Sequence, residues 1–416
     1  MPSGPAADAA ATDPAELLAA AREILPWMVE VRRDFHRHPE LGLEEHRTSA
    51  RVRELLDGMG IEHVDGLGGT GVMGLLRGSA AGANGRAVAL RADLDALPLE
   101  DGKDVPYRSQ VPGRMHACGH DVHTAVLLGA ARLLADRAGP LPGTVKLLFQ
   151  PAEETVGGAK LLIEAGVLYD PPVEAIFGLH VDPTIESGRV GVRYGQRNAS
   201  SDDLAITVRG RAAHGAHAAS GVDAIVAAAH VVTALQSVVA RNVDARDAAV
   251  VTFGTIRGGS QRNILAGEVE LVGTVRALDP EVRALVLRRV RETAEGVAAG
   301  LGARAEVRIE PSYDPLVNHD AMVEVVRAQA GRLLGEAAVE VLPRPSLGVE
   351  DFAFYLARVP GAFWSLGVRD EASGIVHPLH SELFDADEEA MAVGAALQAL
   401  NAIAALSAPP ASEPPH

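Results

Sequence analysis

The chain has 416 residues, of which 47% are apolar, so it is long enough to form two domains with substantial cores. Acidic residues outnumber basic ones 55 to 38, which gives a net charge of −17. This charge argues against a nucleic-acid partner and against an anionic membrane surface, because proteins that bind phosphate-rich partners concentrate Lys and Arg.

The two ends of the chain lack the patterns of folded segments. Residues 1–13 are rich in Ala, Pro and Gly and show neither the basic nor the apolar region of a signal peptide, so a cytoplasmic protein is expected. Residues 407–416 are mostly Pro, Ala and Ser, and both ends are predicted to be disordered tails. No apolar run approaches the roughly 18 to 20 residues of a membrane-spanning helix.

Strand and helix patterns alternate between these ends. The first helix is predicted from Pro14 to about Arg37, because Asp13 can cap it and Pro14 suits its first turn. The short apolar runs that follow are typical of strands buried on both faces. These runs occupy residues 87–92, 144–149, 175–179 and 362–366, and further helical patterns occupy residues 121–138, 321–334 and 387–405.

The middle of the chain has a different order of elements. Strands are predicted at 204–208, 249–256, 269–276 and 303–309, and helices at 222–240 and 280–299. The resulting strand-helix-strand-strand-helix-strand order matches a ferredoxin-like unit. We therefore predict an inserted α+β domain at 198–310, which divides an α/β catalytic domain into 14–197 and 311–406.

The densest group of chemically active residues is the stretch M-H-A-C-G-H-D-V-H, which begins at Met115. Its Cys118 is the only cysteine of the chain, which excludes an internal disulfide. A thiolate at Cys118 and a neutral imidazole at His120 can reach one metal ion if the backbone there is a loop. The alternative is a chance cluster of histidines at a helix N-terminus.

Three further groups of potential ligands follow predicted strands or precede the last helix. Glu153 and Glu154 come directly after one apolar run, where one carboxylate can hold a metal and the other can move protons, although a solvated acidic pair is the alternative. His180 ends another run, and His377 and His380 come from the far end of the chain. Their conjunction around one sheet edge favours a metal site, but the pattern does not rank the two glutamates.

These stretches resemble the N-acyl-amino-acid amidohydrolases, the branch of the aminoacylase and carboxypeptidase metallopeptidases that contains hippurate hydrolase and the plant auxin-conjugate hydrolases. The resemblance spans about residues 14–406. Its further marks are R-R-D-F-H-R-H-P-E-L-G from Arg32, A-L-R-A-D-L-D-A-L-P from Ala89, F-Q-P-A-E-E from Phe149 and G-V-E-D-F from Gly348. It implies an α/β fold in which a discontinuous catalytic domain, with a mixed central sheet flanked by helices, carries an inserted lid and dimerisation domain.

The resemblance also implies a set of site residues. Two divalent metal ions (Mn, Zn or Co) would be held by Cys118, His120, Glu154, His180 and His380, with Cys118 as the bridge. Glu153 would be the general base. Asp93 and Asp95 match the D-x-D stretch of the family: Asp95 would orient a ligating imidazole, and Asp93 has strand-end capping as an equal alternative. His116 and His123 are assigned to the surroundings of the site.

Within the inserted domain, the resemblance places His214 and Asn263 near the substrate. His214 would stabilise the oxyanion, reaching the site of the partner subunit in a homodimer. The chain departs from the family pattern here. The usual G-G-H is A-A-H at 212–214, a usual Pro-His pair is Ala218-Ala219, and the usual Asn-x-Ile-Pro ends in Leu265-Ala266.

The implied reaction is hydrolysis of the amide bond of a small N-acyl-amino acid, which releases a carboxylic acid and an amino acid. A metal-activated water would attack the amide, and Glu153 would move the protons. The alternatives are a dipeptidase or carboxypeptidase with the same metal core, and an inactive metal-binding regulator. The sequence does not identify the acyl group, the amino acid or the native metal.

Overall fold

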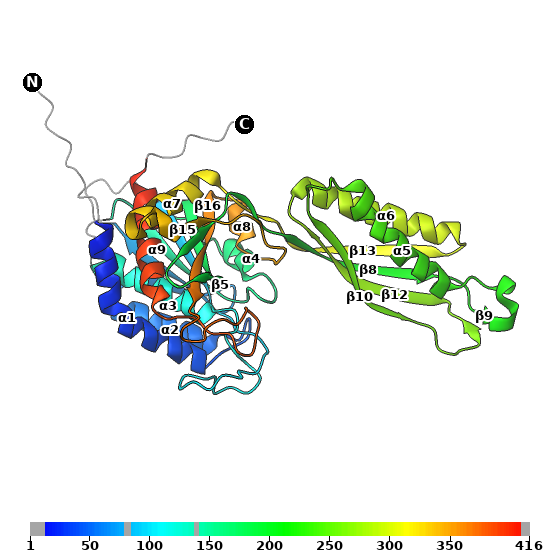
Figure 1. Cartoon of the computed structure of the whole chain (residues 1–416), viewed down its shortest axis with the longest axis horizontal. Coiled ribbons are helices and arrows are strands. Elements are labelled where there is room, and N and C mark those ends of the chain that lie inside the picture. The colour runs from blue at the N-terminus through cyan, green and yellow to red at the C-terminus, as the bar shows by residue number, and fades with distance from the viewer. Residues whose placement is uncertain (1–12, 79–84, 137–140, 409–416) are drawn as a thin grey trace, which may run out of the picture. The chain divides into compact units, whose positions relative to one another are not determined.

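The structure of the chain, a computed structural model, describes residues 13–78, 85–136 and 141–408. These residues form two compact units. The first comprises the described residues up to Gly195, Asn318–Pro343 and the described residues from Phe354 onward, and the second comprises Gln196–Val317 and Arg344–Ala353 (Figure 1). Most of the two predicted disordered tails, residues 1–12 and 409–416, lies outside the described residues.

The first unit is built on an eight-stranded sheet with the order β1-β2-β4-β3-β5-β16-β6-β15. In that order, its strands are β1 (Glu62–Leu67), β2 (Gly71–Arg77), β4 (Thr144–Gln150), β3 (Ala87–Asp93), β5 (Val173–Glu186), β16 (Gly361–Arg369), β6 (Val190–Val192) and β15 (Val339–Val341). The four central strands run parallel, and β1 and β2 pair antiparallel with their neighbours. Strand β6 pairs antiparallel with β16 but parallel with β15. The sheet is therefore mixed, as predicted, and the central strands end at one edge.

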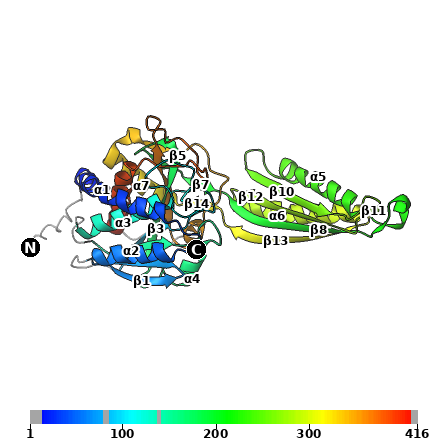
Figure 2. The ribbon, with the colours of Figure 1, turned by 90° about the horizontal axis from the view of Figure 1, so that it is seen from below.

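Helices that are distant in sequence pack together in the first unit. Its helices are α1 (Pro14–Arg37), α2 (His46–Gly58), α3 (His120–Asp136), α4 (Gly158–Glu164), α7 (Asp320–Leu334), α8 (Ala353–Leu356), α9 (Ala390–Ser407) and the 3₁₀ helix η2 (Glu336–Ala338). Helices α1, α3 and α9 contact one another, and α3 and α9 also contact β3 and β5. Figure 2 shows α1 and α3 side by side, next to β3. The predicted cap of the first helix is confirmed, because the Asp13 side chain accepts a hydrogen bond from the N–H of Ala15 at 2.9 Å.

The second unit has the predicted order of strands and helices. It contains β8 (Ser200–Arg209), α5 (Ala224–Asn242), β10 (Ala249–Gly258), β12 (Glu268–Ala277), α6 (Pro280–Gly300) and β13 (Arg304–Tyr313). The sheet is antiparallel with the order β10-β12-β8-β13, and alternate side chains of β8 form one core with the two helices. Short elements complete the chain: β7 (Gly195–Asn198), β9 (Ala213–His214), η1 (Gly215–Ser220), β11 (Ile264–Leu265) and β14 (Leu316–Asn318).

Two helices are longer and more apolar than expected, since no apolar run was predicted to approach the length of a membrane span. By length and composition alone, α5 and α9 are each long and apolar enough to cross a membrane. The apolar window of α9 is 83% buried in the core of the first unit, and that of α5 is 33% buried. The inner face of α5 packs on the sheet of the second unit, while Ile225 and Val226 are exposed.

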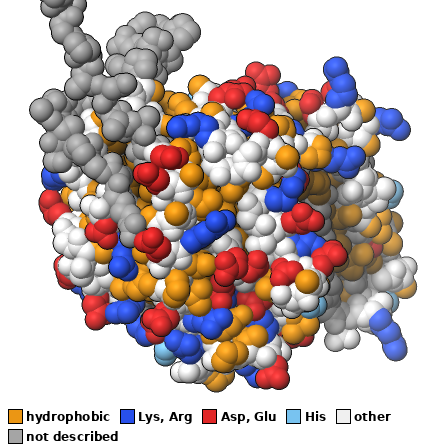
Figure 3. All heavy atoms as spheres, turned by 60° about the vertical axis from the view of Figure 1, so that its left-hand side comes forward, with side chains coloured by type: hydrophobic (Ala, Val, Ile, Leu, Met, Phe, Trp, Pro, Cys, Tyr) orange, Lys and Arg blue, Asp and Glu red, His pale blue; other side chains and the backbone are white. Residues whose placement is uncertain are grey.

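Acidic and basic side chains are interspersed on the face shown in Figure 3. Several acidic and basic side chains of the first unit form ion pairs, such as Arg47 with Asp34 at 2.8 Å and Arg53 with Asp65 at 2.5 Å. Exposed pairs of this kind contribute little stability, typically about 0 to 1 kcal/mol each. The stability of the first unit therefore rests mainly on the aliphatic core between its sheet and its helices.

Candidate metal centre

Cys118 and His120 lie where a loop enters α3. Cys118 is buried in the loop, and His120 is the first residue of the helix, one position before the predicted start. Gly119 stands between them with a φ of 82°, a conformation that favours glycine. A Cβ atom on Gly119 would lie 2.4 Å from Cγ2 of Val181, so a side chain has no room there. The glycine thus lets the loop approach β5 closely, next to His180.

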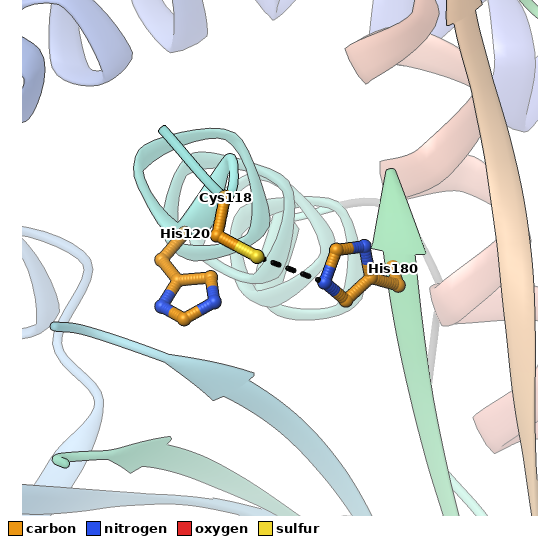
Figure 4. A group of neighbouring side chains, drawn as sticks. All are labelled: Cys118, His120 and His180. Atoms are coloured by element: carbon orange, nitrogen blue, oxygen red, sulfur yellow. Dashed lines mark hydrogen bonds between the residues drawn. The ribbon is translucent and has the colours of Figure 1, made fainter. Parts of the chain in front are cut away.

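The imidazoles of His120 and His180 are both held by main-chain carbonyl oxygens. Nδ1 of His120 donates to the oxygen of Asp95 at 2.8 Å, and Nδ1 of His180 donates to that of Val181 at 2.7 Å. Nε2 of His180 then lies 3.4 Å from Sγ of Cys118 (Figure 4). Nε2 of His120 is buried and has no hydrogen-bond partner among the described residues. A hydrogen bond at Nδ1 that leaves Nε2 available is the usual arrangement of metal-bound histidines.

Glu153 and Glu154 lie in a turn that follows β4. Oδ1 of Asp95 accepts the N–H of Glu153 at 3.1 Å, and Oδ2 accepts the N–H of Glu154 at 3.0 Å. The preceding residue, Ala152, has a left-handed φ of 56°, and its N–H donates to Oε1 of Glu45 at 2.8 Å. Such a conformation costs roughly 1–3 kcal/mol in a residue with a side chain. The buried carboxylates of Asp95 and Glu45 therefore hold a strained turn in place.

His380 reaches the same region from the far end of the chain. Its N–H donates to the carbonyl oxygen of Ala117 at 2.8 Å, which places it beside the loop of Cys118. Its Nε2 lies 3.2 Å from Oε1 of Glu154. His377, the other histidine of this stretch, belongs to no group of potential ligands among the described residues.

The five predicted ligands form two overlapping groups of three. The ligand atoms of Cys118, His120 and His180 lie within 4.8 Å of one another, and so do those of Cys118, Glu154 and His380. Because Cys118 is common to both groups, the geometry is compatible with a thiolate that bridges two ions. A thiolate, imidazoles and a carboxylate suit Zn²⁺, Mn²⁺ or Co²⁺. The donor set fits two divalent cations, and so does Nε2 of His120, which has no hydrogen-bond partner in the described part of the chain.

His123 and Asp93 form a further group with His120, but their polar atoms are already engaged. Nδ1 of His123 lies 2.6 Å from Oδ1 of Asp93, and its Nε2 accepts the N–H of Val181 at 2.9 Å. The other oxygen of Asp93 accepts a hydrogen bond from Arg91 at 2.5 Å. With both ring nitrogens in use, His123 ties α3 to β5 and lies around the site rather than among its candidate ligands.

Four candidate ligands, Cys118, His120, Glu154 and His380, have displaced pKa values in the metal-free protein. Burial raises the pKa of the Cys118 thiol, and nearby carboxylates raise it further. Burial opposes the charge of His120, but the neighbouring carboxylates, Asp93 foremost, raise its pKa to about 10. Burial also opposes the charge of Glu154, yet its contact with His380 and the charges around it lower its pKa to about 2. At neutral pH, the thiol and His120 therefore hold protons while Glu154 is ionised.

Metal binding is consequently expected to release at least two protons per chain, because the thiol of Cys118 and the imidazole of His120 must both be deprotonated to bind metal. The contact with Glu154 raises the pKa of His380 as well, which adds to the release. The affinity should rise with pH by about tenfold per pH unit for each proton displaced. Adding Mn²⁺ to weakly buffered, metal-free protein with a pH indicator measures the release. Binding of two ions without acidification at pH 7 would contradict the protonation states described above.

His214 and Asn263 lie together in the second unit. The N–H of Gly215 donates to the carbonyl oxygen of Asn263 at 2.8 Å, and His214 pairs with Ile264 between β9 and β11. The side chain of His214 is exposed, and its ring centre lies 5.5 Å from that of His217. The two residues predicted near the substrate are thus neighbours within one unit, and the candidate metal ligands all belong to the other.

Some buried polar residues around the site were not predicted from the sequence. Glu45 supports the turn at Ala152, and Arg32 forms buried ion pairs with residues that follow His120 and His380. Arg32 begins the run R-R-D-F-H-R-H-P-E-L-G, and Glu45 follows that run closely. The run marks the resemblance, but nothing in its spacing indicates which later residues it contacts.

Comparisons with known proteins agree with this geometry. Residues 89–402 match the sequence pattern of peptidase family M20/M25/M40. The chain is 39% identical over 367 residues to N-acetylcysteine deacetylase of Bacillus subtilis (strain 168), covering 88% of this chain and 93% of that protein. It is 38% identical over 386 residues to thermostable carboxypeptidase 1 of Saccharolobus solfataricus, with coverages of 92% and 96%.

A similar architecture occurs in a solved structure. The Bacillus subtilis YXEP protein, described as a dinuclear metal binding peptidase from the M20 family, superposes with a TM-score of 0.81 at 35% sequence identity. The match covers 92% of this chain and 99% of that chain. Because each unit makes up far more than the uncovered part of the chain, the similarity includes both units.

Proposed function

The chain belongs to peptidase family M20/M25/M40 and is a metal-dependent hydrolase, and we propose that it cleaves the amide bond of small N-acyl-amino acids. The observation that best supports this function is the pair of ligand groups that share Cys118, with Glu153 in the adjoining turn. The similarity to N-acetylcysteine deacetylase, which covers 88% of this chain, favours an N-acyl substrate. The cytoplasmic location stays a prediction.

Different side chains of the site are proposed to carry out different steps of amide hydrolysis. Two divalent ions, when bound by the five candidate ligands, would lower the pKa of water and polarise a carbonyl group. Glu153 is 7% exposed, and one of its carboxylate oxygens lies within 4.8 Å of ligand atoms of His120 and Glu154. We expect its carboxylate to take a proton from the attacking water and to deliver it to the amide nitrogen as the C–N bond breaks. The products are a carboxylic acid and a free amino acid.

Asp95 is proposed to position these groups rather than to react. Its two oxygens accept the N–H groups of Glu153 and Glu154, and its carbonyl oxygen accepts the ring N–H of His120. A single residue thereby orients the general base and two candidate ligands. Such supporting contacts commonly decide both metal affinity and activity.

The second unit is proposed to act as a lid and dimerisation surface. Its strand β10 is an edge strand, and the neighbouring helix α5 exposes Ile225 and Val226, features that suit association with a second copy. In such a homodimer, His214 would stabilise the oxyanion in the site of the partner subunit, and Asn263 would contact the substrate. The departures from the family pattern at Ala218, Ala219 and Leu265 lie in the same region of the chain and are expected to affect substrate choice.

Replacing His214 by Ala is expected to leave the metals and the fold intact but to lower kcat by roughly 10²–10³-fold, the usual effect of losing an oxyanion donor. If the site is shared, a heterodimer of His214→Ala with Glu153→Gln should regain about half of the wild-type activity, because one of its composite sites has both native groups. Activity assays on heterodimers purified through two different tags measure the recovery. Absence of recovery would mean that His214 acts within its own chain or not at all.

A substrate panel tests the proposed function. Acetyl-, benzoyl- and indoleacetyl-amino acids should be compared with dipeptides, each in the presence of Mn²⁺, Co²⁺ or Zn²⁺. We expect kcat/KM for at least one N-acyl-amino acid to exceed that for every dipeptide by about tenfold or more. The similarity to thermostable carboxypeptidase 1 supports the alternative, a peptidase with the same metal core. Faster cleavage of dipeptides would favour that alternative and refute the proposed substrate class.

A further inference from the structure

The first unit contains a buried group of charged residues, which we call the Arg32 cluster. Arg32 lies on α1, and its side chain is fully buried. Its Nε donates to Asp121 at 2.8 Å, its Nη2 to Asp385 at 2.8 Å and its Nη1 to Glu388 at 3.1 Å. The guanidinium also lies over the ring of Tyr107, 4.8 Å from its centre. These five residues make up the cluster.

The carboxylates of the cluster come from the two segments that carry candidate metal ligands. Asp121 directly follows His120 in the first turn of α3. Asp385 follows His380 in the segment that leads into α9. Arg32 stands on a third element, α1, which supplies no candidate ligand. A single guanidinium therefore joins the segment of His120 to the segment of His380.

The Arg32 cluster contributes more to the geometry of the two segments than to the stability of the fold. Several buried charges give little net stability, because desolvating them costs about as much as their mutual attraction returns. The planar guanidinium, however, fixes the directions and distances of the carboxylates that it binds. Both anchors are held further: the hydroxyl of Tyr107 donates to Asp385 at 2.6 Å, and Nδ1 of His36 lies 2.7 Å from Asp121.

His380 depends on such support because packing does little to fix it. Its side chain is 53% exposed, and its φ of 62° lies in the left-handed region. A main-chain hydrogen bond to Ala117 holds it on one side, and the residues that follow it are held by the Arg32 cluster. A shift of this segment would change the distance from His380 to Cys118 and Glu154.

We propose that Arg32 is a positioning residue of the metal centre, which sets the spacing between His380 and Cys118. It thereby determines the affinity of the ion that Cys118, Glu154 and His380 would hold. The inference rests on the two-ion centre proposed above. The ion held by Cys118, His120 and His180 should depend on Arg32 much less. Although Asp121 beside His120 bonds to Arg32, the ring of His120 is also held by the carbonyl oxygen of Asp95, and that of His180 by the carbonyl oxygen of Val181.

Titration of the metal-free, full-length protein with Co²⁺ tests the proposal without reference to any substrate. Calorimetry gives the affinity of each ion, and the thiolate-to-Co²⁺ absorption reports the bond to Cys118. His380→Ala identifies the ion concerned. Arg32→Met is expected to lower the affinity for that ion by about 10–100-fold, the usual effect of losing a residue that orients a ligand. The variant should still bind the other ion. Arg32→Lys should lower the affinity for this ion similarly, because one ammonium group cannot replace the planar guanidinium that binds both segments.

Arg33 provides a matched control. Its Nη2 donates to Glu388 at 2.6 Å, and its guanidinium lies 4.6 Å from the ring centre of Tyr107, much as that of Arg32 does. Its side chain is 36% exposed, and in the described part of the chain it has no hydrogen bond to Asp121 or Asp385. Arg33→Met should therefore change the affinity of either ion by no more than about twofold, within the small effects usual for exposed pairs.

Asp385→Asn keeps the test decisive if Arg32→Met does not fold, since it removes one charge while preserving shape and the contact with Tyr107. Asp385→Asn should also lower the affinity for the ion that depends on His380. Wild-type affinity for both ions in Asp385→Asn, or in folded Arg32→Met with a lowered Tm, would overturn the proposal and leave Arg32 a core residue only. Failure of the wild-type protein to bind two ions would instead refute the proposed metal centre.

Discussion

Replacing Glu153 by Gln is expected to lower turnover by roughly 10²–10⁴-fold while both metal ions stay bound, because the amide cannot accept the proton of the attacking water. The change preserves the shape of the side chain and leaves the main-chain bond from Glu153 to Asp95 in place. Steady-state kinetics with an N-acyl-amino acid, together with metal analysis of the same sample, measures both effects. The loss should fall on kcat rather than on KM, since the group acts on protons in the transition state.

Glu154→Gln is the matched comparison, because the two glutamates lie in one turn and their N–H groups bind the same Asp95 carboxylate. Glu154 belongs to the ligand group of Cys118 and His380, so its amide variant should lose metal. If Glu153→Gln loses metal and Glu154→Gln keeps it, the proposed roles of the two residues are reversed.

Replacing Cys118 by Ala is expected to remove metal from both positions, since Cys118 is the member that the two ligand groups share. We expect the affinity for each ion to fall by more than about 100-fold, beyond the usual effect of changing a residue that only orients a ligand. Metal content per chain after dialysis, with circular dichroism to confirm the fold, measures the loss. A variant that retains two ions and wild-type activity would exclude Cys118 as a ligand.

Local patterns sufficed to predict the central strands of the first sheet, the four main strands of the second unit and the longest helices. Pro14 and Asp13 mark the start of α1, and the apolar runs of β3 and β4 are buried along their whole length. The edge strand β1 was missed because most of its residues are exposed and it has no apolar run. Strand β5 extends to Glu186, well beyond the predicted run at 175–179, because its last residues pair with β16. That pairing is a tertiary contact that no local pattern contains.

The candidate ligands and the orienting role of Asp95 could be predicted from the sequence with the help of the resemblance, but the other contacts that support them could not. Cys118 and His120 are close in sequence, and Glu154 and His180 follow apolar strands, so their chemistry is visible in the sequence itself. The contact between Asp95 and the glutamate turn joins loops that follow different strands. The bond from Arg32 to Asp385 spans most of the chain, and such long-range pairs have no periodic or spacing signal in a single sequence.

A metal titration followed by hydrolysis tests the central claim most directly. The protein is first freed of metal with a chelator and then receives Mn²⁺ or Co²⁺ in increments while release of the amino acid from an N-acyl-amino acid is recorded. We expect no hydrolysis in the metal-free protein and an activity that rises to its maximum at two ions per chain. Full activity in chelated protein, or no hydrolysis of any N-acyl-amino acid with two ions bound, would contradict a two-metal amidohydrolase.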